Sequence, residues 1–132
     1  MERLELVLPA SVTAPRAARE FLRASLATRD LDGFGDVSEL LTTELVTNAV
    51  VHADSSLTLR VITWGDRVRV EVDDASTRPA VPRPRDPTTP SGNGLLLVEE
   101  LATRWGVDLR EDGKTVWFEI DIPTATRKIH GT

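Results

Sequence analysis

Three side chains capable of chemistry follow one another at one-turn spacing in the segment ELVTNAVVHA, residues 44–53. At 100° per residue, Glu44, Asn48 and His52 fall within about 80° of one another on one side of a helix. The helix predicted around this segment, over about residues 37–53, contains no Lys or Arg. Carboxylate and amide oxygens suit Mg²⁺, which takes one or two protein oxygens and completes its shell with water and phosphate oxygens. The segment therefore indicates a magnesium site, with an ordinary exposed acid and amide as the alternative.

A further acidic group ends the alternating pattern VRVEVDD. With a period of two, Asp74 projects onto the same face as Val68, Val70 and Val72. A carboxylate on an apolar face is unfavourable unless a hydrogen-bond donor satisfies it, and the exocyclic amine of a nucleobase is such a donor. An aspartate that merely enters a turn would give the same pattern.

The run Gly92-Asn93-Gly94-Leu95 opens an apolar helical pattern. Glycines let the backbone approach a ligand, and the free amides of a helix N-terminus favour anions, although a G-x-G run alone is a weak signal. Residues 75–93 hold five of the eight prolines and show no apolar periodicity, so they predict a loop. Loops of this length in compact domains usually carry function.

These residues must be positioned by helices and strands that the remaining periodicity predicts. Strands are expected over residues 3–8, 56–64, 67–73, 107–110 and 115–122, and helices over about 13–28, 37–53 and 94–105. Two predicted hairpins make most of the sheet antiparallel. The sequence therefore predicts an α+β two-layer sandwich, with a mixed, mostly antiparallel sheet and three helices on one face. One domain is expected over residues 1–123, followed by a disordered tail over 124–132.

Composition excludes several classes of protein. The chain has 132 residues, a formal charge of −5 and no cysteine. A disulfide framework, a thiolate zinc site and a cysteine nucleophile are thereby excluded. A negative net charge argues against non-specific nucleic-acid binding. No window has the apolar length of a membrane span or the pattern of a signal peptide, so a cytoplasmic protein is expected.

The motifs, in this order, resemble those of the GHKL ATPases with the Bergerat, or histidine-kinase-like ATPase, fold. Residues 44–53 are similar to their N-box and 70–76 to their first glycine box, while 91–107 and 113–120 are similar to the second box and closing strands. The resemblance covers roughly residues 5–122 and is greatest to stand-alone anti-sigma-factor serine/threonine kinases of the RsbW-like, actinobacterial type. It implies transfer of the ATP γ-phosphate to a STAS-type anti-anti-sigma partner and sequestration of a sigma factor. It implies no direct contact with nucleic acid or membrane, and such relatives often form homodimers.

The resemblance also implies roles for individual residues. Asn48 would hold Mg²⁺ at the triphosphate, and Glu44 would accept the proton of the attacking serine or threonine hydroxyl. Asp74 would accept a hydrogen bond from the adenine amino group, with Thr115 in the same network. The other positions implied to bind ATP are His52, Ser76, Gly92, Asn93, Gly94 and Leu95. Residues 75–93 would form the ATP lid.

The first glycine box departs from the family pattern. It reads Asp74-Ala75-Ser76, with no glycine where the family usually has one. A regulatory module that binds nucleotide without transferring phosphate is therefore kept as an alternative function. A fragment related to sensor histidine kinases is a second alternative, which the absence of a domain with a phospho-accepting histidine disfavours.

Overall fold

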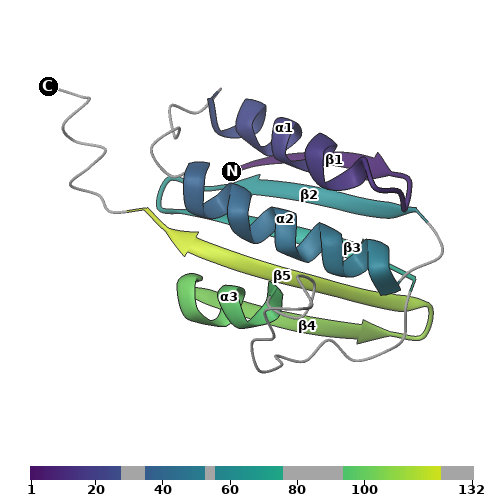
Figure 1. The fold of residues 1–132 in the computed structure, drawn as a ribbon. Helices are drawn as coiled ribbons and strands as arrows, with labels where there is room; N and C mark the ends of the chain where they lie inside the picture. Colours follow the sequence, from purple (N-terminus) through teal and green to yellow (C-terminus); the bar gives the residue numbers. More distant parts are fainter. Residues whose placement is uncertain (28–34, 53–55, 76–93, 123–132) are drawn as a thin grey trace, which may run out of the picture.

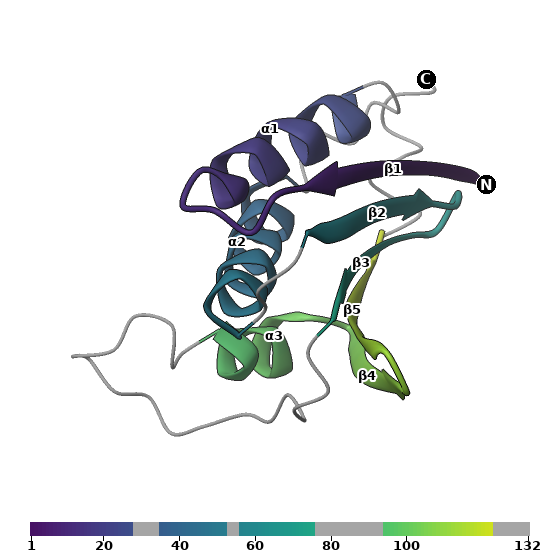
Figure 2. The same ribbon diagram turned by 90° about the vertical axis from the view of Figure 1, so that its right-hand side faces the viewer.

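The computed structural model describes residues 1–27, 35–52, 56–75 and 94–122, which fold into two layers. A five-stranded sheet with the order β1-β2-β3-β5-β4 forms one layer, and three helices cover one of its faces (Figures 1 and 2). The strands are β1 (Glu2–Leu8), β2 (Leu57–Thr63), β3 (Arg67–Asp74), β4 (Arg104–Arg110) and β5 (Gly113–Asp121), and the helices are α1 (Ala14–Ala27), α2 (Gly35–His52) and α3 (Gly94–Leu101). The predicted two-layer sandwich is confirmed.

The sheet is more uniform than the mixed sheet that the sequence predicted. All four pairings between the described strands are antiparallel. Strand β5 lies between β3 and β4, so the chain segment that contains α3 and β4 separates two strands that are neighbours in space. The side chains of β3 and β5 are therefore brought together by a pairing distant in sequence.

The core lies between the helices and the sheet. Along β3 the side chains alternate strictly between half-buried and buried, as the period of two predicts. The largest fully buried side chain is Phe118 of β5, and Leu22, Leu41 and Val98 contribute from the three helices. Each such side chain contributes roughly 1.5–3 kcal/mol when removed from water, so this interface supplies much of the stability.

The first residues of α1 and α2 explain where these two helices begin. Thr13 precedes α1, and its carbonyl accepts the Ala17 amide at 3.2 Å. Pro15 lies in the first turn, where no amide hydrogen is needed. Helix α2 begins at Gly35, two residues earlier than predicted, so Asp36 is in the first turn rather than at the cap. Its carboxylate there interacts favourably with the helix dipole.

The third helix is shorter than the sequence predicted. Helix α3 ends at Leu101, and the next residues leave it to pair with β5: the Thr103 amide donates to the Glu119 carbonyl at 2.8 Å. The apolar run that continues to Trp105 was predicted to be helical, whereas β4 already begins at Arg104 and Trp105 packs on the core from this strand. Periodicity cannot separate a helical end from a buried strand in so short an apolar run.

The face of the sheet away from the helices carries a ladder of ion pairs. Arg60 donates to Glu71 at 2.7 Å and to Asp73 at 2.5 Å. Arg69 donates to Glu71 at 2.7 Å and to Glu119 at 2.9 Å, and its guanidinium stacks on the Trp117 ring. Arg104 bridges Glu119 and Asp121. Cross-strand pairs of opposite charge stabilise the register.

These pairs shift the ionisation of the acids. Burial by itself raises the pKa values of Glu71, Asp73 and Glu119, but hydrogen bonds from arginines outweigh it and hold all three values below the ordinary range. Acids whose pKa is lower in the folded state stabilise the fold above their ordinary values, and this contribution is lost as pH falls.

Two predictions of the sequence, the lid and the tail, concern residues outside this description. The predicted lid, apart from Ala75, and the predicted tail over 124–132 lie beyond the described residues. Among the helices that are described, none combines the length and the apolar character needed to cross a membrane.

We expect the free energy of unfolding to decrease as the pH falls below about 4, near the ordinary pKa values of 3.8 and 4.5. Urea unfolding between pH 7 and pH 3 would measure it. Arg60→Met removes the partner of Glu71 and Asp73, so this variant should show a shallower decrease. An identical pH dependence in both proteins would contradict the assigned role of the ladder.

Candidate functional site

The polar residues of the N-box segment lie on one border of α2. Leu45, Val46 and Ala49 are buried, Val51 is exposed, and Glu44 and Asn48 are half-buried. Glu44 and Asn48 thus lie where the buried side of the helix meets its exposed side, as their spacing predicted.

This border faces away from α1. Glu39 accepts a hydrogen bond from Arg23 of α1 at 2.6 Å, which fixes the side of α2 that lies against α1. Asn48 follows nine residues later, about 180° around the helix. Because α2 lies between α1 and α3 (Figure 1) and also contacts α3, the Glu44–Asn48 border is on the α3 side. Helix α3 begins at Gly94, the second glycine of the G-x-G run, as the sequence predicted.

Glu44 has the ionisation expected of a partly dehydrated acid. Burial raises the pKa of its carboxyl above the ordinary value, and among the described residues no cation opposes this shift. A general base works best when its pKa approaches the operating pH. The partly dehydrated environment of Glu44 therefore suits proton acceptance better than the environment of a fully hydrated glutamate.

Asp74 lies on the helix side of the sheet, as alternation predicted. Its side chain is 1% exposed, and its Oδ1 accepts a hydrogen bond from Lys114 Nζ at 3.2 Å. Lys114 is 3% exposed, directly opposite Asp74 in the β3–β5 register. Lys114 was not among the site residues predicted from the sequence. The available signal was alternation along β5, which places Lys114 on the same face as the buried Val116 and Phe118.

Thr115 does not join Asp74. It pairs with Asp73 in the β3–β5 register, and its hydroxyl donates to Asp73 Oδ1 at 2.6 Å. It also accepts from Arg110. Asp73 is bound to Arg60 of the ladder, so Thr115 faces the opposite side of the sheet from Asp74. Thr115 and Asp74 therefore lie on opposite faces of the sheet, because in a strand a shift of one residue reverses the face.

Gly113 permits a close approach between two strand ends beside this pair. A Cβ atom at Gly113 would lie 2.0 Å from the Asp74 carbonyl oxygen, closer than any real contact. Its backbone also has a positive φ of 157°. Glycine is therefore required where β5 begins next to the end of β3.

The other predicted ATP positions are only partly described. His52 is the last residue of α2 and Leu95 follows the first residue of α3, and their backbones alone are described. Ser76, Gly92 and Asn93 lie outside the described residues. Among the side chains that are described, no group of three or more His, Cys, Asp or Glu could hold a metal ion. A magnesium ion at Glu44 and Asn48 would therefore need oxygens from another source, such as phosphates.

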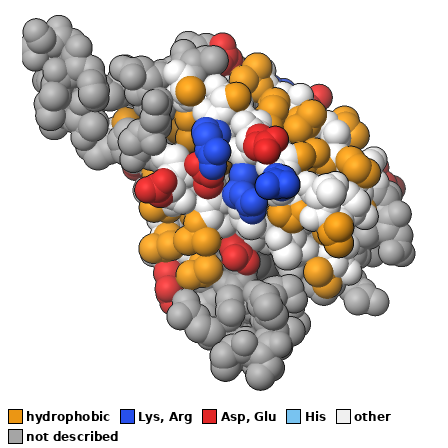
Figure 3. Space-filling view, turned by 45° about the horizontal axis from the view of Figure 1, so that its top comes forward, with side chains coloured by type: hydrophobic (Ala, Val, Ile, Leu, Met, Phe, Trp, Pro, Cys, Tyr) orange, Lys and Arg blue, Asp and Glu red, His pale blue; other side chains and the backbone are white. Residues whose placement is uncertain are grey.

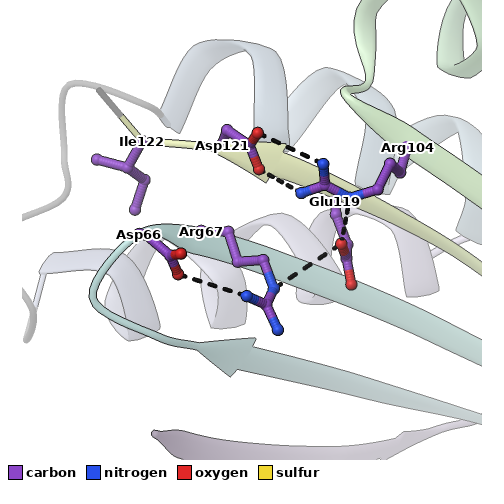
Figure 4. Close-up of a pocket in the computed structure, with 6 residues that line it drawn as sticks. All are labelled: Asp66, Arg67, Arg104, Glu119, Asp121 and Ile122. Atoms are coloured by element: carbon purple, nitrogen blue, oxygen red, sulfur yellow. Dashed lines mark hydrogen bonds and ion pairs between the residues drawn. The ribbon is translucent and has the colours of Figure 1, made fainter. Parts of the chain in front are cut away.

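A hollow in the surface lies away from these residues. It has a volume of about 560 Å³ at the other end of the sheet and is lined by Asp66, Arg67, Arg104, Glu119, Asp121 and Ile122 (Figure 4). Both of its arginines are paired with acids: Arg67 approaches Asp66 at 3.5 Å, and Arg104 binds Glu119 and Asp121. This hollow is the end of the ion-pair ladder, and its charges are already matched.

Three arginines of helix α1 lie at or near its solvent-facing side. Arg16 and Arg23 are exposed and Arg19 is half-buried, and basic side chains gather over this part of the surface in Figure 3. Arg23 is paired with Glu39. The arrangement matches an ordinary solvated helix face.

Comparison with known proteins gives the family. Residues 8–120 match the family described as histidine kinase-like ATPase domain. The chain belongs to this family. An uncharacterized protein of Streptomyces coelicolor is 35% identical over 82 residues, which cover 58% of this chain and 78% of that protein.

A solved structure shares the fold of this histidine kinase-like ATPase domain. The crystal structure of the RsbU and RsbW domains of Rv1364c from Mycobacterium tuberculosis aligns with a TM-score of 0.68 at 22% identity. The alignment covers 91% of this chain and 32% of that one, so the present chain spans about a third of that structure.

The buried ion pair of Asp74 and Lys114 predicts how substitutions change the free energy of unfolding. Asp74→Asn would leave the Lys114 ammonium buried without its counter-charge, which should lower the free energy of unfolding by about 3–5 kcal/mol. The double variant Asp74→Asn with Lys114→Met removes both charges and should regain most of that loss. Urea unfolding of the three proteins measures this difference. Equal stability of Asp74→Asn and the unchanged protein would refute a buried pair.

Proposed function

We propose that this chain is an ATP-binding serine/threonine kinase of the anti-sigma-factor type. It would phosphorylate a STAS-type anti-anti-sigma protein and sequester a sigma factor. The family match to the histidine kinase-like ATPase domain and the RsbW-like fold support an ATP-binding regulatory protein. The observation that carries the kinase proposal is the half-buried Glu44, with its raised pKa, one helical turn from Asn48.

Each residue has a chemical role in this proposal. ATP would supply the γ-phosphoryl group, and its phosphate oxygens would complete the shell of a magnesium ion. Asn48 would contribute its amide oxygen to that ion, since hard oxygen ligands suit it. Glu44 would accept the proton that the serine or threonine hydroxyl of the partner loses as its oxygen bonds to the γ-phosphorus. The bond between the γ-phosphorus and the bridging oxygen would break in the same transfer, and ADP would be the leaving group. Asp74 would accept a hydrogen bond from the base.

A second function remains open because of one structural observation. Asp74 is already paired with Lys114, and the sequence after it lacks the family's usual glycine. A domain altered in this way could bind nucleotide and a protein partner without transferring phosphate.

Phosphotransfer tests the catalytic role of Glu44. With labelled Mg·ATP and a STAS-type protein, Glu44→Gln should reduce label on the partner by about 10²–10⁴-fold. Glu39→Gln, on the α1 side of the same helix, is the matched control and should retain the label. The activity of the unchanged protein should fall as the pH drops through the raised pKa of Glu44, because only the ionised carboxylate accepts a proton.

Stability gives an independent readout for the same variant. A raised pKa in the folded state means that the ionised Glu44 destabilises the fold above that pKa. Glu44→Gln should therefore unfold at an equal or higher temperature at pH 7. Nucleotide binding without label on any STAS partner would favour the second function, and label that persists in Glu44→Gln would refute the assigned base.

Calorimetry tests the magnesium role of Asn48. Asn48→Ala should weaken ATP binding in the presence of Mg²⁺ by about 10–100-fold, the range for one polar contact to a charged group. Without Mg²⁺ the variant and the unchanged protein should bind ATP alike. Thr47→Ala, its half-buried neighbour, is the matched control. An equal loss of affinity with and without Mg²⁺ would count against a role in holding the ion.

A further inference from the structure

The pairing of Asp74 with Lys114 places two opposite hydrogen-bonding groups side by side. Asp74 Oδ1 and Lys114 Nζ are 3.2 Å apart, and both side chains are more than nine-tenths buried. The pair lies at the ends of β3 and β5, on the face that the helices cover. An acceptor and a donor at this separation match a ligand whose own donor and acceptor are adjacent.

The ammonium group of Lys114 has hydrogen-bonding capacity to spare. It carries three donors, and in the described part of the chain Asp74 is its one hydrogen-bond partner. A buried donor without an acceptor is unfavourable, so the remaining N–H groups of the Lys114 ammonium need acceptor atoms within hydrogen-bond distance. The other cations near this hairpin do not share the property, since Arg110 contacts the ladder residues Thr115 and Asp73 on the opposite face.

The position of the pair relates it to the proposed nucleotide. Asp74 is the residue proposed to accept a hydrogen bond from the adenine amino group. In adenine that amino group is attached to the carbon next to N1, a ring nitrogen that only accepts hydrogen bonds. Asp74 and Lys114 together can therefore satisfy the amino group and N1 in one plane.

We propose that Lys114 is a base-recognition residue that donates a hydrogen bond to N1 of adenine while Asp74 accepts from the amino group. This proposal rests on the proposed ATP-binding function. Lys114 would add a second, direct contact to the edge of the base, beside the contact of Asp74. The proposed site would then recognise adenine through two hydrogen bonds, one donated by Lys114 and one accepted by Asp74, rather than through Asp74 alone.

The competing consequence of the same pair is that Lys114 blocks Asp74. In that case the ammonium competes with the amino group of the base, and its removal should strengthen ATP binding. The two consequences differ in sign, so one set of variants separates them.

The test compares ATP with 1-deaza-ATP, in which a C–H group replaces N1, by titration calorimetry. The unchanged protein should bind ATP about tenfold more tightly than 1-deaza-ATP. Lys114→Met should bind both nucleotides equally, at the affinity that the unchanged protein has for 1-deaza-ATP. Arg110→Met is the matched control because it removes a cation from the same hairpin on the other face, and it should keep the preference for ATP.

Other outcomes overturn the proposal. Equal binding of the two nucleotides by the unchanged protein, a preference that persists in Lys114→Met, or tighter ATP binding by that variant would each refute it while leaving ATP binding intact. If neither nucleotide binds at millimolar concentration, the proposed function fails as well. Should Lys114→Met not fold, as judged by circular dichroism, the comparison of Asp74→Asn with the double variant replaces it. The preference for ATP should then persist only where Lys114 remains.

Discussion

The pairing of β3 with β5 is the constraint on which the candidate site depends. In this register Asp74 lies opposite Lys114, and both are buried on the helix side. A buried charge is tolerated only with a partner, so the ion pair and the register reinforce each other. Gly113 makes the close approach possible, because any side chain there would collide with the Asp74 backbone. The residue proposed to contact the base is thus fixed by a contact between segments 40 residues apart.

Helix α2 packs on the core and also positions the proposed site residues, and these two roles have opposite effects on stability. One side packs Leu45 and Ala49 into the core, and the adjacent border carries Glu44 and Asn48 towards α3. Packing is what partly dehydrates Glu44 and raises its pKa. An acid in this environment destabilises the fold when ionised, yet its readiness to accept a proton increases. Such an exchange of stability for reactivity is common at functional sites.

The two faces of the sheet use charge in different ways. Away from the helices, arginines and acids alternate across neighbouring strands, each partly hydrated and matched by several partners. On the helix side the described residues of β3 and β5 place a single ion pair at the end of the apolar layer. The ladder therefore contributes to stability and register, whereas the buried pair of Asp74 and Lys114 belongs to the proposed base site. The hollow lined by Asp66, Arg67 and Arg104 belongs to the ladder and not to the proposed site.

Much of the fold and part of the site could be predicted from local patterns. The period of 3.6 in residues 44–52 determined that Glu44 and Asn48 share a side of a helix, and the period of two determined that Asp74 faces the core. The residues that complete the site could not be found in this way. Lys114 and Thr115 are adjacent, and the resemblance of motifs pointed to Thr115 because such a resemblance does not specify strand register. Only tertiary structure decided that Lys114 meets Asp74, since the register of β3 on β5 depends on packing between distant segments rather than on either strand alone.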